Sequence, residues 1–142
     1  MRDRPRPLHL SWSNVAIVAL GGAVGTGLRY GITLVVPTWA GVPIATLGIN
    51  VVGAFLLGLL LELLADRSID TGWSRRIRLG AGTGGLGGFT TYSALATETA
   101  ALAITRPGLA IAYAFGTVLI GAAASIAGIW LSRVHLRPSA GE

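Results

Sequence analysis

Four apolar runs constrain the fold of this chain more than any other feature. They cover residues 12–36, 42–65, 79–104 and 108–132, and each is long enough to cross a membrane as a helix, which takes about 20 residues. Of the 142 residues, 52% are hydrophobic and 12% are charged, which leaves too little polar surface for a soluble fold. The sequence therefore predicts an all-α membrane protein in which residues 1–142 form a single four-span transmembrane domain.

A cleaved signal peptide is the alternative interpretation of the first run. Basic residues precede the run and small residues lie within it, as in such peptides. However, the run continues past Gly31 to Val36, which is longer than the apolar core of a signal peptide, and its removal would leave three spans. We therefore interpret residues 12–36 as the first membrane span.

The basic residues are all arginines, and their placement predicts the orientation. With four spans, both termini and the 66–78 loop share one side of the membrane, and the opposite side carries Arg106 alone. Short arginine-rich segments stay in the cytoplasm, so both termini are expected there, in the cell membrane. The net charge of +5 then suits lipid headgroups and membrane insertion and needs no nucleic acid. The arginines of the first side are Arg2, Arg4, Arg6, Arg67, Arg75, Arg76, Arg78, Arg133 and Arg137.

Polar residues inside the runs predict a conduit for a small anion. Each is costly in hydrocarbon unless it finds a partner or water. A hydroxyl taken singly is explained by a bond to its own helix, but a set that faces a shared path favours a conduit. Amides, hydroxyls and aromatic edges offer hydrogen-bond donors, which suit an anion better than a cation. The set comprises Thr46 and Asn50 in the second run, Thr90, Thr91, Ser93, Thr97 and Thr99 in the third, and Tyr113, Thr117 and Ser125 in the fourth.

Catalysis and proton-coupled transport are both disfavoured by the residues available. His9 and His135 are expected outside the spans, and Glu98, near the end of the third run, is the only buried carboxylate. The sequence has no metal-ligand cluster, no paired carboxylates and no plausible serine–histidine pair, so we expect no enzyme.

The stretch GAGTGGLGGFTTYSALATE, residues 80–98, predicts a helix that breaks inside the membrane. Six of its first nine residues are glycine, although its flanks are apolar. Backbone can leave the helix inside a membrane only where protein or a water-filled cavity satisfies it. We expect the break at Gly84–Gly88, where freed carbonyl oxygens would suit a hard cation. A glycine-lined packing groove would give the same pattern, so it stays open as the alternative.

Three motifs resemble one known family. GGFTTYSALATE (87–98) is similar to the third-span signature GGxTTFSTF of the Fluc/CrcB family of small bacterial fluoride channels. GGAVGTGLRYGI (21–32) resembles the first-span stretch of that family, and TLGINVVGAFLLG (46–58) resembles its second-span stretch with an asparagine.

The resemblance implies a specific architecture and site. The family forms an antiparallel dimer of four-span subunits with two pores, and a structural sodium ion (Na⁺) is held by carbonyls that match Gly87 and Thr90. Asn50 matches an amide that donates to fluoride, and Arg29 matches an arginine of the vestibule. Thr91 and Ser93 fall in the polar signature of the third span, and Tyr113 and Thr117 resemble the polar track of the fourth span, so the resemblance implies that all four line the fluoride path. The implied function is passive export of fluoride, which reduces its toxicity.

Two departures from the family pattern suggest a modified dimer. Tyr92 and Leu95 stand where the family has two phenylalanines whose ring edges flank fluoride, so one ring is absent. The strong arginine bias also fits one orientation, whereas an antiparallel homodimer inserts both ways. We therefore expect either a homodimer or a heterodimer with a paralogous subunit. A proton-coupled exporter of the small multidrug-resistance type would need a carboxylate in the first span, where there is none. A non-conducting assembly subunit is the other alternative.

Overall fold

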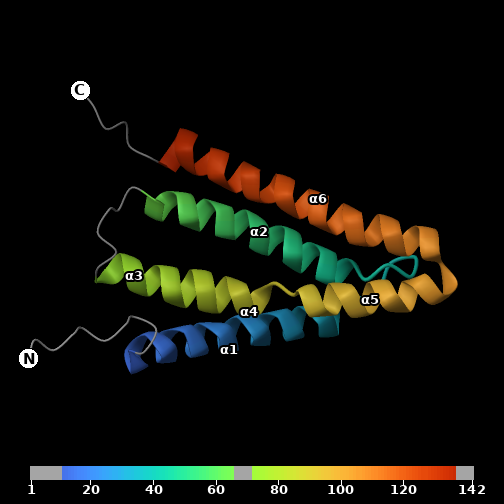
Figure 1. Cartoon of the computed structure of the whole chain (residues 1–142), viewed down its shortest axis with the longest axis horizontal. Helices are drawn as coiled ribbons and strands as arrows, with labels where there is room; N and C mark the ends of the chain where they lie inside the picture. Colours follow the sequence, from blue (N-terminus) through green and yellow to red (C-terminus); the bar gives the residue numbers. More distant parts are fainter. Residues whose placement is uncertain (1–10, 66–71, 137–142) are drawn as a thin grey trace, which may run out of the picture.

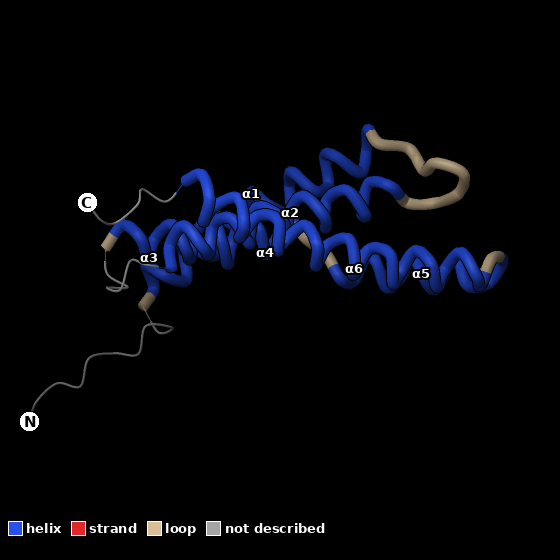
Figure 2. The backbone as a smooth tube through the Cα atoms, turned by 90° about the horizontal axis from the view of Figure 1, so that it is seen from above, coloured by secondary structure: helices blue, strands red, loops and turns tan. Residues whose placement is uncertain are grey.

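The computed structural model describes residues 11–65 and 72–136, and these are helical apart from short connections (Figures 1 and 2). Three long helices are apolar enough to cross a membrane. They are α1 (Trp12–Val35), α2 (Ile44–Ala65) and α6 (Pro107–Leu131), which continues into η3 (Ser132–Leu136). The described residues contain no β-strand, so the predicted all-α membrane class is confirmed.

The third predicted run is a composite of shorter helices. It consists of η2 (Arg78–Leu86), α4 (Gly87–Phe89) and α5 (Tyr92–Thr105), and it is preceded directly by α3 (Trp73–Ile77). The helix is continuous through Phe89 and stops at Thr90 and Thr91, whose backbones are extended, with φ/ψ of −73°/156° and −150°/119°. Together the pieces run the length of the bundle (Figure 1).

The interruption itself was expected, but its predicted position was wrong. Residues Gly84–Gly88 remain helical. Up to Leu86 the turns are wider than those of an α-helix, and the Gly87 N–H bonds to the carbonyl of Gly82, five residues back. The break falls instead at Thr90–Thr91. The glycines serve close packing, as described below, and the break is stabilised by polar side chains that follow them.

Two predicted boundaries also need correction. The expected 66–78 loop is helical from Trp73 onward, so Arg75, Arg76 and Arg78 lie on a helix, whereas residues 66–71 lie outside the described residues. The last helix extends to Leu136, and the apolar segment that it forms includes His135. His135 therefore lies in the final turn of that helix and not in a tail, because nothing in the sequence SRVHL stops the helix.

Glycine contacts hold α1 against η2 and α4. A Cβ atom added to Gly21 would collide with the Gly80 carbonyl oxygen, and one added to Gly25 would collide with the Gly85 carbonyl oxygen. Helices in a membrane gain little from apolar contact alone, so close backbone approach of this kind is a main source of their association. The same contact brings α1 next to the break.

The second tight contact joins α2 to α6. A Cβ on Gly58 would collide with the Ser125 carbonyl oxygen, and one on Gly128 would collide with that of Phe55. At the end of this pair, Arg133 Nε donates to Glu62 Oε1 at 2.9 Å and Arg133 Nη2 donates to Glu62 Oε2 at 3.3 Å. The bundle is thus two closely packed helix pairs, and α5 lies against α6.

A tight turn closes the opposite end, between α1 and α2. Trp39 and Val42 exchange two backbone hydrogen bonds of 3.0 and 2.8 Å around Ala40 and Gly41, which have φ angles of 52° and 82°. Arg106, from the α5–α6 connection, donates to the Ala40 carbonyl at 2.9 Å. The two connections at this end are therefore linked.

We expect Ala40→Gly to stabilise the protein by about 0.5–1 kcal/mol, because Ala40 is held in the left-handed region that costs a residue with a Cβ about 1–2 kcal/mol. Thermal unfolding in detergent measures the change. Ala101→Gly, inside α5, is the control and should destabilise by about 0.5–1 kcal/mol. A lower unfolding temperature for Ala40→Gly would contradict the expectation.

Candidate functional site

Asn50 of α2 binds the backbone exposed by the helix break. Its Oδ1 accepts from the Thr91 N–H at 2.8 Å, and its Nδ2 donates to the Thr91 carbonyl at 3.0 Å. One side chain thus satisfies both backbone groups of a residue that has left the helix. Because the amide nitrogen carries two hydrogens, one remains that can donate to a ligand.

Thr91 also begins the second half of the broken helix. Its Oγ1 accepts from the Ala94 N–H at 3.1 Å, which makes Thr91 the N-cap of α5. The Ser93 hydroxyl lies 3.2 Å from the Thr91 hydroxyl, and Ser93 is exposed on this chain. Two hydroxyls and an amide therefore gather at the start of α5.

Several carbonyls at the break have donors from the chain itself. The Leu86 carbonyl accepts from both the N–H and the hydroxyl of Thr90, each at 2.9 Å. The Gly88 carbonyl accepts from Arg29 Nε and from Thr26 Oγ1 of α1, each at 3.3 Å. The predicted vestibule residue Arg29 therefore reaches the backbone beside the break.

The carbonyls of Gly87 and Thr90 are in a different position. In an uninterrupted helix they would accept from the N–H groups of Thr91 and Ala94. Here the Thr91 N–H bonds to Asn50, and the Ala94 N–H bonds to the Thr91 hydroxyl. Both carbonyls are thus released from α-helical pairing, and Gly87 is exposed on this chain.

A half-buried carboxylate, Glu98, forms a second polar cluster with α2, one turn before Asn50. Glu98 Oε1 accepts from the Thr46 hydroxyl at 2.7 Å, and Glu98 Oε2 accepts from the Tyr113 hydroxyl at 2.6 Å. Three helices meet at this carboxylate. The sequence identified Glu98 as the only buried carboxylate but did not connect it to Thr46 and Tyr113. The sequence does show that Thr46 lies one turn from Asn50 on the same helix. Spacing along one helix cannot show that side chains of two other helices bond to it.

The remaining predicted pore residues occupy different surroundings. The Thr117 hydroxyl bonds at 2.7 Å to the Tyr113 carbonyl of its own helix. Tyr92 is 80% exposed, whereas Leu95 is 5% exposed, so the two positions that depart from the family pattern point differently. Both border an open cavity of about 450 Å³ between α5 and α6, together with Phe115 and several alanines.

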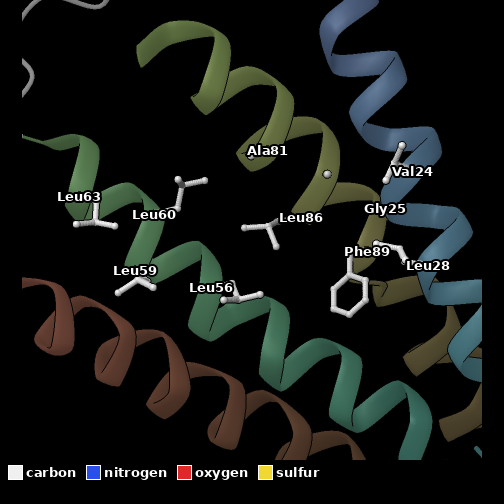
Figure 3. A pocket seen from close by; sticks show the side chains of 11 residues that line it. Val24, Gly25, Leu28, Leu56, Leu59, Leu60, Leu63, Ala81, Leu86 and Phe89 are labelled. Atoms are coloured by element: carbon white, nitrogen blue, oxygen red, sulfur yellow. The ribbon is translucent and has the colours of Figure 1, made fainter. Parts of the chain in front are cut away.

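The larger cavity has no polar lining. It measures about 500 Å³ and lies between α1, α2 and the first half of the broken helix (Figure 3). Glycine, alanine, valine, leucine and phenylalanine form its whole lining, including Leu56, Leu86 and Phe89. It offers no hydrogen-bond donor to an anion, so the candidate site is the polar cluster at the break.

Comparison with known proteins identifies the family. A family model described as "CrcB-like protein, Camphor Resistance (CrcB)" matches residues 16–129, which include Asn50 and the break. The chain belongs to the CrcB family. The resemblance noted in the sequence is thereby confirmed.

Relatives of this CrcB chain match it over most of their own length. The fluoride-specific ion channel FluC 2 of Leifsonia xyli subsp. xyli is 50% identical over 126 residues, which cover 88% of this chain and 87% of the relative. A fluoride-specific ion channel FluC of Thermus thermophilus is 45% identical over 108 residues, or 74% and 83% of the two chains. That of Caulobacter vibrioides is 40% identical over 124 residues, or 85% and 96%.

Proposed function

We propose that this CrcB protein is a fluoride channel, not an enzyme, and lets fluoride leave the cell passively through the cytoplasmic membrane. One observation carries the proposal: the third apolar segment is interrupted at Thr90–Thr91, and Asn50 holds the interruption open, in a chain whose relatives are named fluoride-specific ion channels. Fluoride holds its water strongly, so a narrow pore has to replace hydration with hydrogen bonds.

The fluoride path proposed from the site begins with the free hydrogen of Asn50 Nδ2. Ser93 and Tyr92 follow Thr91 at the start of α5 and are exposed, so a hydroxyl and an aromatic ring are available on the surface that a second subunit would cover. Thr91, Leu95, Tyr113 and Thr117 complete the lining, and Arg29 is the vestibule residue. Glu98 holds the hydroxyls of Thr46 and Tyr113 and thereby fixes the orientation of the wall.

The proposed subunit has four spans, with the composite segment 73–105 as the third. Its helices together are long enough to cross a membrane, and the segment lies along α1 through glycine contacts. In Figure 1 the chain enters α1 and leaves α6 at the same end of the bundle. The segments that carry the other described arginines follow the same division: α3, the start of η2 and η3, with Arg75, Arg76, Arg78 and Arg133, lie at that end, and the α5–α6 connection, with Arg106, lies at the other. This supports termini on the cytoplasmic side.

A structural sodium ion at the dimer interface is part of the proposal. The donors fit: the carbonyls of Gly87 and Thr90 are released from helical pairing, and Gly87 is exposed where a second subunit would pack. Within residues 11–65 and 72–136, no three histidine, cysteine, aspartate or glutamate residues are grouped as metal ligands, so backbone oxygens are the available ligands. Hard oxygen donors suit a hard cation such as Na⁺.

The subunits of the proposed dimer are antiparallel, and they are either two copies of this chain or this chain and a paralogue. The arginine distribution favours one orientation for this chain, which supports pairing with an oppositely oriented paralogue, whereas a homodimer is the simpler arrangement. A proton-coupled exporter is less well supported, because α1 carries no carboxylate. A non-conducting assembly subunit is also less well supported, because such a role gives no reason for the polar cluster at the break.

Fluoride efflux from liposomes that contain the purified chain tests the function. We expect release of fluoride without a proton gradient and no measurable release of chloride. Release that depends on a proton gradient would indicate an exporter, and no release of fluoride, either alone or with a co-expressed paralogue, would contradict the channel. Efflux from the chain alone would exclude an obligatory heterodimer.

A further inference from the structure

Arg29 lies at the carbonyl end of the first half of the broken helix. Its Nε donates to the Gly88 carbonyl at 3.3 Å, and the side chain is half-buried. The backbone of Gly88 packs directly against α1, since a Cβ added to Gly88 would lie 2.5 Å from the Gly22 carbonyl oxygen. The close backbone contact between Gly22 and Gly88 therefore keeps α1, which carries Arg29, beside the break.

This helix end attracts positive charge. The last carbonyls of a helix carry a partial negative charge because their dipoles align. The guanidinium of Arg29 is one cation placed there. A metal ion at the Gly87 and Thr90 carbonyls would be a second cation at the same helix end, because Gly87 directly precedes the residue that Arg29 binds. The two positive charges would then repel each other.

In the described part of the chain, no acidic side chain forms an ion pair with Arg29 to offset this repulsion. The described part of the chain contains two acidic residues, Glu62 and Glu98. Glu62 pairs with Arg133, and Glu98 accepts from Thr46 and Tyr113. Carbonyl oxygens alone also bind Ca²⁺, which is close to Na⁺ in size. The ligands by themselves therefore leave the charge of the ion undetermined.

We propose that Arg29 determines the charge of the cation at the Gly87–Thr90 carbonyls, admitting a monovalent ion and disfavouring a divalent ion of the same size. This inference rests on the cation included in the proposed function. Coulomb repulsion is proportional to the charge of the ion, so Arg29 opposes Ca²⁺ twice as strongly as Na⁺. Thr26, which binds the same carbonyl without a charge, contributes only to its orientation.

The test measures cation-dependent thermal stability of the full-length protein in detergent, with NaCl, CaCl₂ and choline chloride at matched ionic strength. We expect Na⁺ to stabilise the wild type at lower concentrations than Ca²⁺. Neutral Arg29→Gln should shift the preference towards Ca²⁺ by about 10- to 30-fold, the effect of one unit charge about 8–12 Å from the ion at an effective dielectric constant of about 20. Arg29→Met is a second neutral variant in case Arg29→Gln does not fold.

Two variants separate charge from structure. Arg29→Lys keeps the charge and should keep the Na⁺ preference, whereas Thr26→Val removes a donor from the same carbonyl and should leave the preference unchanged. The inference is overturned if the neutral variants retain the wild-type ratio, if Thr26→Val shifts the ratio equally, or if the wild type shows no response to Na⁺. Fluoride efflux, measured separately, reports on the proposed function, so failure of the cation inference leaves that result intact.

Discussion

Asn50→Ala is expected to reduce fluoride efflux by about 100-fold and to destabilise the protein. The substitution removes both hydrogen bonds to Thr91, at 2.8 and 3.0 Å, and leaves the N–H and carbonyl of a buried residue without these partners. Each of the two unsatisfied groups costs about 1–3 kcal/mol, so the total is about 2–6 kcal/mol. A rise of about 2.7 kcal/mol in a barrier corresponds to a 100-fold lower rate. Liposome efflux and thermal unfolding measure the two effects.

Asn50→Asp distinguishes the donor from the shape of the side chain. The carboxylate can still accept from the Thr91 N–H but places an oxygen against the Thr91 carbonyl, so we expect a loss of efflux similar to that of Asn50→Ala. Thr99→Val is the matched control, because the Thr99 hydroxyl bonds at 2.7 Å only to its own helix at Leu95. Efflux within twofold of wild type for Asn50→Ala would rule out the role assigned to this residue.

Gly25→Ala is expected to cost about 3 kcal/mol or more in the free energy of unfolding, or to prevent assembly. The added Cβ would collide with the Gly85 carbonyl oxygen and would lie 2.8 Å from the Phe89 nitrogen. Both neighbours are backbone atoms, which cannot rotate away, so α1 would have to separate from the segment that contains the break. Overpacking costs about 1–3 kcal/mol even where side chains can adjust.

Gly27→Ala provides the control on the same helix. A Cβ at Gly27 meets no atom of this chain within 4 Å, and alanine favours a helix over glycine by about 1 kcal/mol, so its unfolding temperature should equal or exceed that of the wild type. Thermal unfolding in detergent and the yield of monodisperse protein give the comparison. Equal unfolding temperatures for Gly25→Ala and the wild type would show that the helix contact is looser than described.

The break illustrates what local sequence conveys and what it does not. Glycine clustering correctly indicated that segment 79–104 departs from a regular helix, but glycine was assigned the wrong role. Gly84 and Gly88 are helical and lie against α1, where a Cβ would meet the backbone of Val18 and Gly22. The chain leaves the helix at Thr90–Thr91, because Asn50 from another helix binds the backbone there. Long-range partners of this kind leave no periodic signal.

Residue chemistry was easier to predict than residue pairing. The motif resemblance selected Asn50, Thr91 and Ser93, which the fold brings together at the start of α5. Arg29 was expected near a vestibule, and its bond to the Gly88 carbonyl was not anticipated. Glu98 was recognised as a buried carboxylate, yet its position between Thr46 and Tyr113 depends on three helices that are distant in sequence.

The sequence alone determined the membrane class, the long apolar helices and the family, because hydrophobic length and short motifs are local properties of the chain. Only the tertiary structure decided which backbone groups at the break form hydrogen bonds and which side chains are their partners. That outcome depends on how closely α1 and α2 approach the third segment, and glycine contacts between backbones set this approach. The carbonyls of Gly87 and Thr90 lack their α-helical donors because the N–H groups of Thr91 and Ala94 bond instead to the side chains of Asn50 and Thr91.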